Sequence, residues 1–183
     1  GSVVVGVVDT GVQYNHPDLA ANMWNNPYEV AGNGIDDDHN GVVDDVYGYN
    51  AVANSGNPMD DHGHGSHCAG IIGAAGNNSR GIVGVNWNVK IMALKFLDSG
   101  GSGTLDDAIE AIEYAIRMRQ AGVNLKVLSN SWGSGYYAQS LEAAVAAASN
   151  AGLLFVAAAG NDGEDNDAFA SYPANFDAPS VMS

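Results

Sequence analysis

The sequence predicts one α/β domain over residues 1–183, a three-layer sandwich with a mostly parallel central sheet between helices. Two observations lead to this prediction. Apolar runs of the length of strands alternate with segments of helical periodicity along the chain. The runs are apolar throughout, which is typical of strands that helices cover on both faces of a parallel sheet.

The individual elements follow from these runs and from the residues that end them. Glycine and asparagine interrupt the chain between runs, and residues 15–63 are so rich in Gly, Asn, Asp and Pro that they predict long irregular segments. The expected strands are 2–8, 90–97, 127–131 and 153–158. The expected helices are 64–76, one from the cap Thr104 to Gly122, and 141–151.

The helix that follows Thr104 has the clearest local signals. Thr104 is a good N-cap residue, and Asp107 stands three residues later, where a capping box places its acid. Apolar residues then recur at helical spacing. The buried stripe of this helix is therefore expected to consist of Leu105, Ile109, Ile112 and Ile116.

Composition excludes several classes of partner. Six Lys and Arg against 21 Asp and Glu give a formal charge of −15. Nucleic acids and anionic membranes are bound by basic surfaces, so neither is an expected partner. Such an acidic chain suits a secreted, calcium-rich or salty setting. Cys68 is the single cysteine, which excludes an intramolecular disulfide and a zinc site built from cysteines.

Polar segments follow three of the expected strands, at the edge of the sheet where open α/β sheets bind their ligands. Each segment taken alone is also typical of an ordinary turn. The segments are Asp9-Thr10-Gly11, Ser131-Trp132-Gly133 and Ala159-Gly160-Asn161.

Three histidines, His62, His64 and His67, lie within six residues. They indicate either a metal site or a catalytic base. The zinc-peptidase pattern H-E-x-x-H has a glutamate where this chain has Gly65, and the sequence shows no further zinc ligand. A base that is oriented by a buried carboxylate fits the segment better, and Asp9 supplies such a carboxylate.

Five motifs occur in a familiar order: D-T-G-V at 9–12, H-P-D-L at 16–19, H-G-S-H-C-A-G at 64–70, S-N-S-W-G at 129–133 and A-A-G-N at 158–161. Together they resemble the subtilisin-like serine proteases, or subtilases of peptidase family S8, and most of all the branch of proteinase K and thermitase. The resemblance implies a subtilisin-like fold and the hydrolysis of peptide bonds by acyl transfer.

The resemblance also implies a role for single residues. Asp9 is then the triad aspartate, His64 the triad histidine, and Asn161 the amide of the oxyanion hole. His62 lines the substrate cleft, and His67 is a packed residue of the helix. These roles agree with the chemistry, since an imidazole that takes a hydroxyl proton needs a carboxylate to fix its tautomer.

In this family the polypeptide substrate is held as an added strand between two chain segments. The resemblance places Leu105 and Trp132 beside the pockets for apolar side chains of the substrate. The residues expected to bind the substrate are Gly101, Ser102, Gly103, Leu105, Ser131, Trp132, Gly133, Ala159 and Gly160.

The family motif G-T-S-M-A, which carries the nucleophilic serine, does not occur in this sequence. We therefore expect a partial peptidase domain that is truncated at both ends and inactive alone. Besides a polypeptide substrate, its expected partners are its own missing carboxyl-terminal segment or a propeptide.

The acidic segment 36–45 predicts a calcium site. Oxygen-bearing side chains alternate before Gly41, as in the loop pattern D-x-[DN]-x-[DN]-G. Tyr47 stands where that loop has its last glutamate, so Asp44 or Asp45 has to close the cage. A solvated acidic turn is the alternative. The expected ligands are Asp36, Asp38, Asn40, the Val42 carbonyl, Asp44 and Asp45, with Glu29 as a weaker candidate.

The resemblance implies a second, weaker calcium site, formed by side chains of Asp18 and Asn78 with the carbonyls of Gly76, Arg80 and Ile82. Two alternatives to a serine peptidase also stay open. One is a metal-dependent hydrolase that uses the three histidines. The other is a catalytically inactive module that binds calcium or a partner protein.

Overall fold

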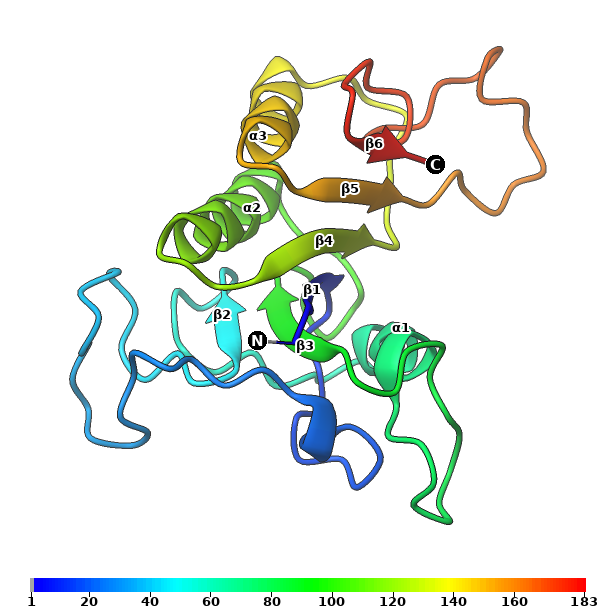
Figure 1. Cartoon of the computed structure of the whole chain (residues 1–183). Coiled ribbons are helices and arrows are strands. Elements are labelled where there is room, and N and C mark those ends of the chain that lie inside the picture. Colours follow the sequence, from blue (N-terminus) through cyan, green and yellow to red (C-terminus); the bar gives the residue numbers. More distant parts are fainter. Residues whose placement is uncertain (1) are drawn as a thin grey trace.

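The computed structural model describes residues 2–183, which form a six-stranded sheet whose paired strands are all parallel (Figure 1). The strand order is β2-β3-β1-β4-β5-β6. The predicted parallel sheet is therefore confirmed. The strands are β1 (Val4–Asp9), β2 (Gly48–Asn50), β3 (Lys90–Lys95), β4 (Leu125–Asn130), β5 (Leu154–Ala157) and β6 (Val181–Met182).

Helices lie on both faces of this sheet (Figure 1). Helices α2 (Leu105–Gln120) and α3 (Gln139–Asn150) cover one face, while α1 (His64–Gly73) packs against β1 and β3 on the other. A short 3-10 helix, η1, spans Ala20–Asn22. The larger apolar cluster lies beneath α2 and α3, and a smaller one lies beneath α1. The predicted three-layer sandwich is therefore confirmed.

Two details of the predicted elements are wrong. Strand β2 lies within residues 15–63, which the composition predicted to be irregular; it has three residues and pairs with residues 93–95 of β3. Helix α1 ends at Gly73 rather than at residue 76. No helix within residues 2–183 combines the length and the apolar character that a membrane span requires.

Helix α2 begins with the predicted capping box, in which the Asp107 N–H donates to the Thr104 hydroxyl. Of its predicted buried stripe, Ile112 is confirmed as fully buried, whereas Leu105 is 40% exposed and Ile109 is only half-buried. Small residues instead let the helix approach the sheet closely. The buried side of α2 consists of Ala108, Ala111, Ile112, Tyr114, Ala115 and Met118.

Candidate active site

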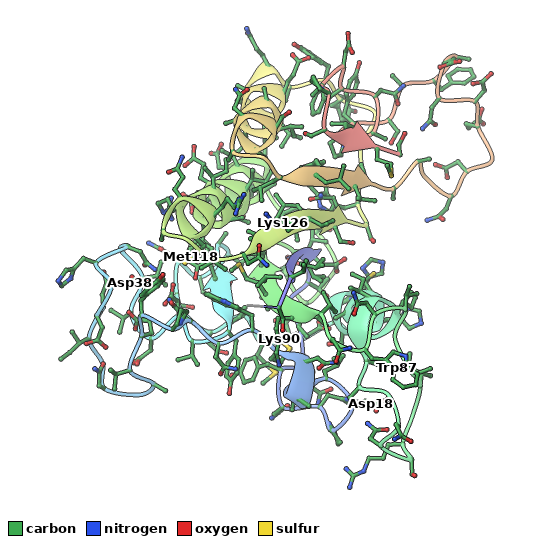
Figure 2. The ribbon with its side chains drawn as sticks, in the orientation of Figure 1. Asp18, Asp38, Trp87, Lys90, Met118 and Lys126 are labelled. Carbon is green, nitrogen blue, oxygen red and sulfur yellow. The ribbon has the colours of Figure 1, made fainter. Side chains whose placement is uncertain are left out.

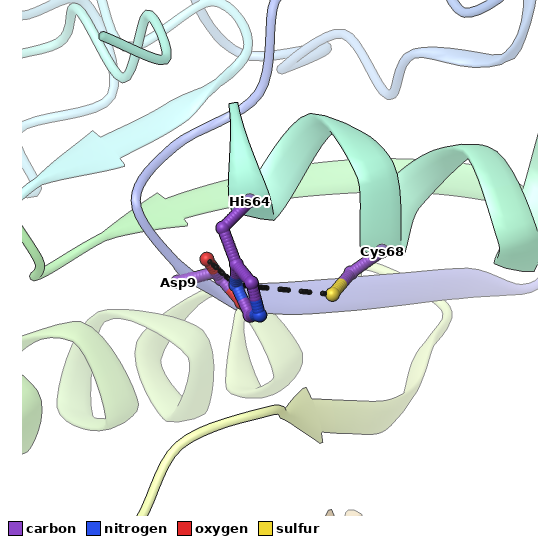
Figure 3. Close-up of side chains that lie close together, drawn as sticks. All are labelled: Asp9, His64 and Cys68. Atoms are coloured by element: carbon purple, nitrogen blue, oxygen red, sulfur yellow. Dashed lines mark hydrogen bonds and ion pairs between the residues drawn. The ribbon is translucent and has the colours of Figure 1, made fainter. Parts of the chain in front are cut away.

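The last residue of β1, Asp9, meets the first residue of α1, His64, at the carboxyl edge of the sheet (Figure 3). His64 Nδ1 lies 2.8 Å from Asp9 Oδ1 and 2.9 Å from Oδ2. Asp9 is fully buried, whereas the His64 side chain is 44% exposed. A carboxylate that accepts the Nδ1–H proton leaves Nε2 as the acceptor. The geometry is that of an imidazole base oriented by a carboxylate.

A glycine permits this close contact between helix and strand. A Cβ atom at Gly65 would lie 2.1 Å from the carbonyl oxygen of Gly11 and 3.1 Å from Asp9 Oδ1. Any side chain at this position would therefore push the first turn of α1 away from the end of β1. The residue directly after His64 has to be small for the pair to form.

Cys68 lies one helical turn beyond His64, and its side chain points toward the imidazole (Figure 3). Its Sγ atom is 4.0 Å from His64 Nδ1. Burial raises the pKa of the Cys68 thiol, so the sulfur stays protonated near neutral pH and is a poor nucleophile. Cys68 packs against the smaller apolar cluster, as expected for a small hydrophobic residue.

The other two histidines do not join His64 in a metal site. The ring centroids of His62 and His64 are 6.4 Å apart, and His62 faces the cleft beside α1. His67 is exposed on α1, so its prediction as a packed residue is wrong. Among residues 2–183, the sets of three side chains whose ligand atoms lie within 4.8 Å of one another do not include all three histidines.

A cleft of about 610 Å³ opens beside His64. It continues through residues 131–134 into a cavity of about 810 Å³, which Ala159, Gly160 and Asn161 line. The structure thus brings all the predicted substrate-binding residues to one continuous depression. The residues that line the cleft itself include Gly101, Ser102, Gly103, Leu105, Ser131, Trp132 and Gly133.

The first wall of the cleft is a tight turn that Asp98 holds together. Its carboxylate accepts hydrogen bonds from the N–H groups of Gly100 and Ser102, and the N–H groups of Ser102 and Gly100 lower the pKa of Asp98. Across the cleft floor, the rings of Phe96 and Trp132 pack edge to face at 4.8 Å. The turn at 100–102 and the segment of Trp132 on the other side of the cleft are therefore both fixed to the body of the domain.

The acidic segment brings three carboxylates together. Carboxylate oxygens of Glu29, Asp36 and Asp38 lie within 4.8 Å of one another. Oε2 of Glu29 is buried and has no hydrogen-bond partner among residues 2–183. An unpaired buried carboxylate oxygen beside two further acids fits a hard cation such as Ca²⁺. Glu29, the weaker candidate in the sequence, thus lies at the centre of this cluster.

The remaining predicted ligands divide into two groups. Asn40 donates to Asp38 Oδ2 at 3.0 Å and to Asp45 Oδ2 at 2.7 Å. Asn40 and Asp45 therefore adjoin the cluster. Burial raises the pKa of Asp45 to about 6. Asp44 instead accepts N–H groups of residues 32–34, and Val42 is buried. The structure does not bring the Asp44 carboxylate to the cluster.

The second predicted calcium site is built around Asp18. Its Oδ1 accepts from Asn78 Nδ2 at 2.7 Å, and its Oδ2 accepts from the Ile82 N–H at 2.9 Å. The same two hydrogen bonds lower the pKa of Asp18. Gly76 and Arg80 lie in the same loop between α1 and β3. Figure 2 shows Asp18 and Asp38 on different loops that are well apart in this view, so the two predicted sites do not share these ligands.

Two charged residues beside Asp9 were missed in the sequence. Lys95 ends β3 and is 3% exposed, and its Nζ donates to the carbonyl of Thr10 and to Asp61 Oδ1. Asp60 accepts hydrogen bonds from Thr10 and from the segment around His64. The only signal for Lys95 was a charge in an otherwise apolar strand, and Asp60 had none.

Comparisons with known proteins agree with this geometry. A family model described as "Subtilase family" matches residues 1–183. Subtilisin-like protease 1 of Plasmodium vivax is 46% identical over 160 residues, which cover 87% of this chain and 25% of that protein. Thermitase of Thermoactinomyces vulgaris is 37% identical over 171 residues, which cover 93% of this chain and 52% of thermitase.

A solved structure is also similar. The crystal structure of a cold-adapted subtilisin-like serine proteinase matches with a TM-score of 0.68 and 29% identity, over 94% of this chain and 50% of that one. The chain thus spans about a quarter of the Plasmodium relative and about half of the other two proteins. The family match over the whole chain shows that this protein belongs to the subtilase family of serine peptidases.

Proposed function

We propose that this chain is part of a serine endopeptidase that hydrolyses peptide bonds by acyl transfer. The contact between Asp9 and His64 at the edge of the cleft carries the proposal. His64 Nε2 takes the proton of a serine hydroxyl, and Asp9 stabilises the imidazolium that results. The serine comes from a segment other than residues 1–183, since the motif G-T-S-M-A does not occur there.

The rest of the depression supports binding of a polypeptide. An extended substrate pairs with the segments 101–103 and 131–133, which supply backbone groups along the cleft. The side-chain amide of Asn161 lies in the adjoining cavity and donates to the oxygen that becomes negative during acyl transfer. Leu105 and Trp132 present apolar surface to the side chains of the substrate.

Labelling of the serine tests the proposal. Residues 1–183 alone are expected to show no peptidase turnover and no covalent labelling by a phosphonofluoridate. Adding a carboxyl-terminal segment that carries the serine motif, in cis or as a second chain, should restore both. His64→Ala in the restored protein should then abolish turnover, because its base is lost. Strong labelling of a serine in the isolated chain would contradict the proposal.

An uncovered part of the sheet supports a partner that packs against it. Within residues 2–183, no helix lies above strands β4 and β5 on the face that carries α1 (Figure 1). Val127 pairs with Leu154 there, and Leu154 is 37% exposed while Val156 is half-buried. Apolar strands of a parallel sheet are normally covered. The carboxyl-terminal segment with the serine, or a propeptide, is the partner that we propose for this face.

We further propose that the protein is secreted and binds Ca²⁺ at Glu29, Asp36 and Asp38. The buried, unpartnered oxygen of Glu29 supports the site, because adjacent carboxylates repel one another without a cation. An extracellular setting supplies calcium and suits the charge of −15. The cation would neutralise the cluster and hold its loop; it takes no part in acyl transfer.

A thermal titration tests the calcium site. Calcium should raise the melting temperature of the chain, because it binds only the folded state. At a calcium concentration of a hundred times the Kd, the stabilisation of the folded state should be about 2.7 kcal/mol. Asp38→Ala should remove most of that gain. Asp37→Ala is the matched control, because the Asp37 carboxylate bonds Val30 and Asn33 outside the cluster. A melting temperature that does not respond to calcium would refute the site.

A further inference from the structure

Thr10 lies where β1, β3 and α1 meet, and all of its polar atoms are bonded. Its N–H donates to Asp9 Oδ1 at 2.7 Å, and its carbonyl accepts from Lys95 Nζ at 2.8 Å. Its hydroxyl donates to Asp60 Oδ1 at 2.9 Å and accepts the Gly65 N–H at 2.9 Å. Thr10 is 1% exposed. The residue next to Asp9 is therefore bonded directly to the residue next to His64.

The Asp60 carboxylate accepts four hydrogen bonds besides that of Thr10. They come from the N–H groups of His62 at 3.0 Å and Gly63 at 2.8 Å, and from the N–H and hydroxyl of Ser66 at 2.9 and 2.6 Å. Burial alone would raise the pKa of Asp60, but these hydrogen bonds outweigh it and lower the pKa to about 2. Asp60 is therefore ionised at neutral pH, and its partners lie on both sides of His64.

This carboxylate also takes the place of a helix cap. The N-cap residue of α1 is Gly63, which has no side chain to bind the free N–H groups of the first turn. The N–H of Gly65 is bound by Thr10 and that of Ser66 by Asp60. The end of α1 that carries His64 is thus capped by residues outside the helix.

We propose that Asp60 is a positioning residue, which holds the first turn of α1 against Thr10 so that His64 Nδ1 meets the Asp9 carboxylate. The proposal rests on the proposed role of Asp9 and His64 in catalysis. Asp60 acts through Thr10 and α1 and does not touch the substrate's scissile bond. Because Lys95 holds the Thr10 carbonyl separately, loss of Asp60 loosens the helix while β1 stays in place.

Proton NMR of His64 in residues 1–183 tests this inference. An Nδ1–H that is held on a buried carboxylate gives a far-downfield resonance, which the unchanged chain should show. Asp60→Asn, which has the same shape, should broaden or abolish this resonance by faster exchange with water. Thr10→Val should do the same, because it removes only the hydroxyl that joins Asp60 to Gly65, whereas Thr10→Ser should preserve the resonance.

The control variant is Asp98→Asn, which removes an equal charge from a carboxylate that holds a turn on the other side of the cleft. It should leave the His64 resonance unchanged. In a form completed with the serine segment, Asp60→Asn should lower kcat about 10- to 100-fold with KM little changed, because a small misplacement of the base slows the chemical step. If Asp60 had a purely structural role, Asp60→Asn would lower the melting temperature but leave the His64 resonance intact at temperatures well below unfolding.

The outcomes separate the two proposals. A missing resonance in the unchanged chain would overturn the Asp9–His64 pair and, with it, the proposed function. A resonance that persists in both Asp60→Asn and Thr10→Val, at an unchanged exchange rate, would overturn the positioning role alone. If Asp60→Asn does not fold, Ser66→Ala decides the question by the same resonance, since it removes one of the five donors to Asp60.

Discussion

Asp60 makes part of the stability of this domain depend on pH. Its pKa is about 2 in the folded chain against an ordinary value of 3.8. The folded state therefore binds the proton less readily than the unfolded state does. The stabilisation is complete above about pH 4 and is lost as the pH falls toward about 2.

Urea unfolding between pH 5 and pH 2 measures this effect. The free energy of unfolding should fall over this range, and Asp60→Asn should reduce the part of the fall below about pH 4, because asparagine cannot take up the proton. Glu113→Gln changes an exposed carboxylate on α2 and serves as the control. A variant at residue 60 that keeps the slope of the unchanged chain would contradict the assignment.

At the residue scale, the sequence revealed the parts of the site that lie in short motifs. Asp9 follows an apolar run, and His64 begins a glycine-rich helix, so each could be found from its neighbours in sequence. Asp60 and Lys95 could not, because their roles depend on partners that the fold brings from distant segments, and for the same reason Glu29 was only a weaker candidate. The sequence does not distinguish an aspartate whose carboxylate accepts five hydrogen bonds from one whose carboxylate is solvated.

At the scale of the element, Gly65 and Gly70 are buried glycines of α1 with different surroundings. Gly65→Ala should destabilise the domain by about 1–3 kcal/mol and displace His64 from Asp9, because its Cβ would lie 2.1 Å from a backbone oxygen. Gly70→Ala should be tolerated, and it should gain up to about 1 kcal/mol of helix propensity, since its Cβ meets only Ile82 at 3.5 Å. Denaturant unfolding of both variants measures the difference.

A similar loss of stability in the two glycine variants would show that the contact with β1 does not decide the result.

The element scale also shows where sequence analysis fails. The capping box of α2 is local and was predicted correctly. The buried side of α2 depends on how closely the sheet and α3 approach, so alanines form much of it and Ile112 is the fully buried member of the expected stripe. Strand β2 exists only through its pairing with β3.

At the scale of the whole molecule, the net charge of −15 opposes the compact state. In calcium-free buffer, raising NaCl from 0.01 to 0.1 M should increase the melting temperature, because the screening length falls from about 30 to about 10 Å. CaCl₂ at equal ionic strength should increase it further in the unchanged chain, but not in Asp38→Ala. A melting temperature that falls with added NaCl would show that ion pairs, not repulsion, dominate the surface.

The position of β1 in the sheet has a consequence for how the domain forms. β1 is the first strand of the chain but lies between β3 and β4, so that Val4 pairs with Lys90 on one side and Leu125 on the other. Pairings between such distant residues close long loops, which slows folding. During synthesis, β1 lacks one or both of its neighbours until β3 and then β4 have been made, and this apolar strand is exposed to aggregation in that time. The strand that carries Asp9 is thus made before both of the strands that enclose it.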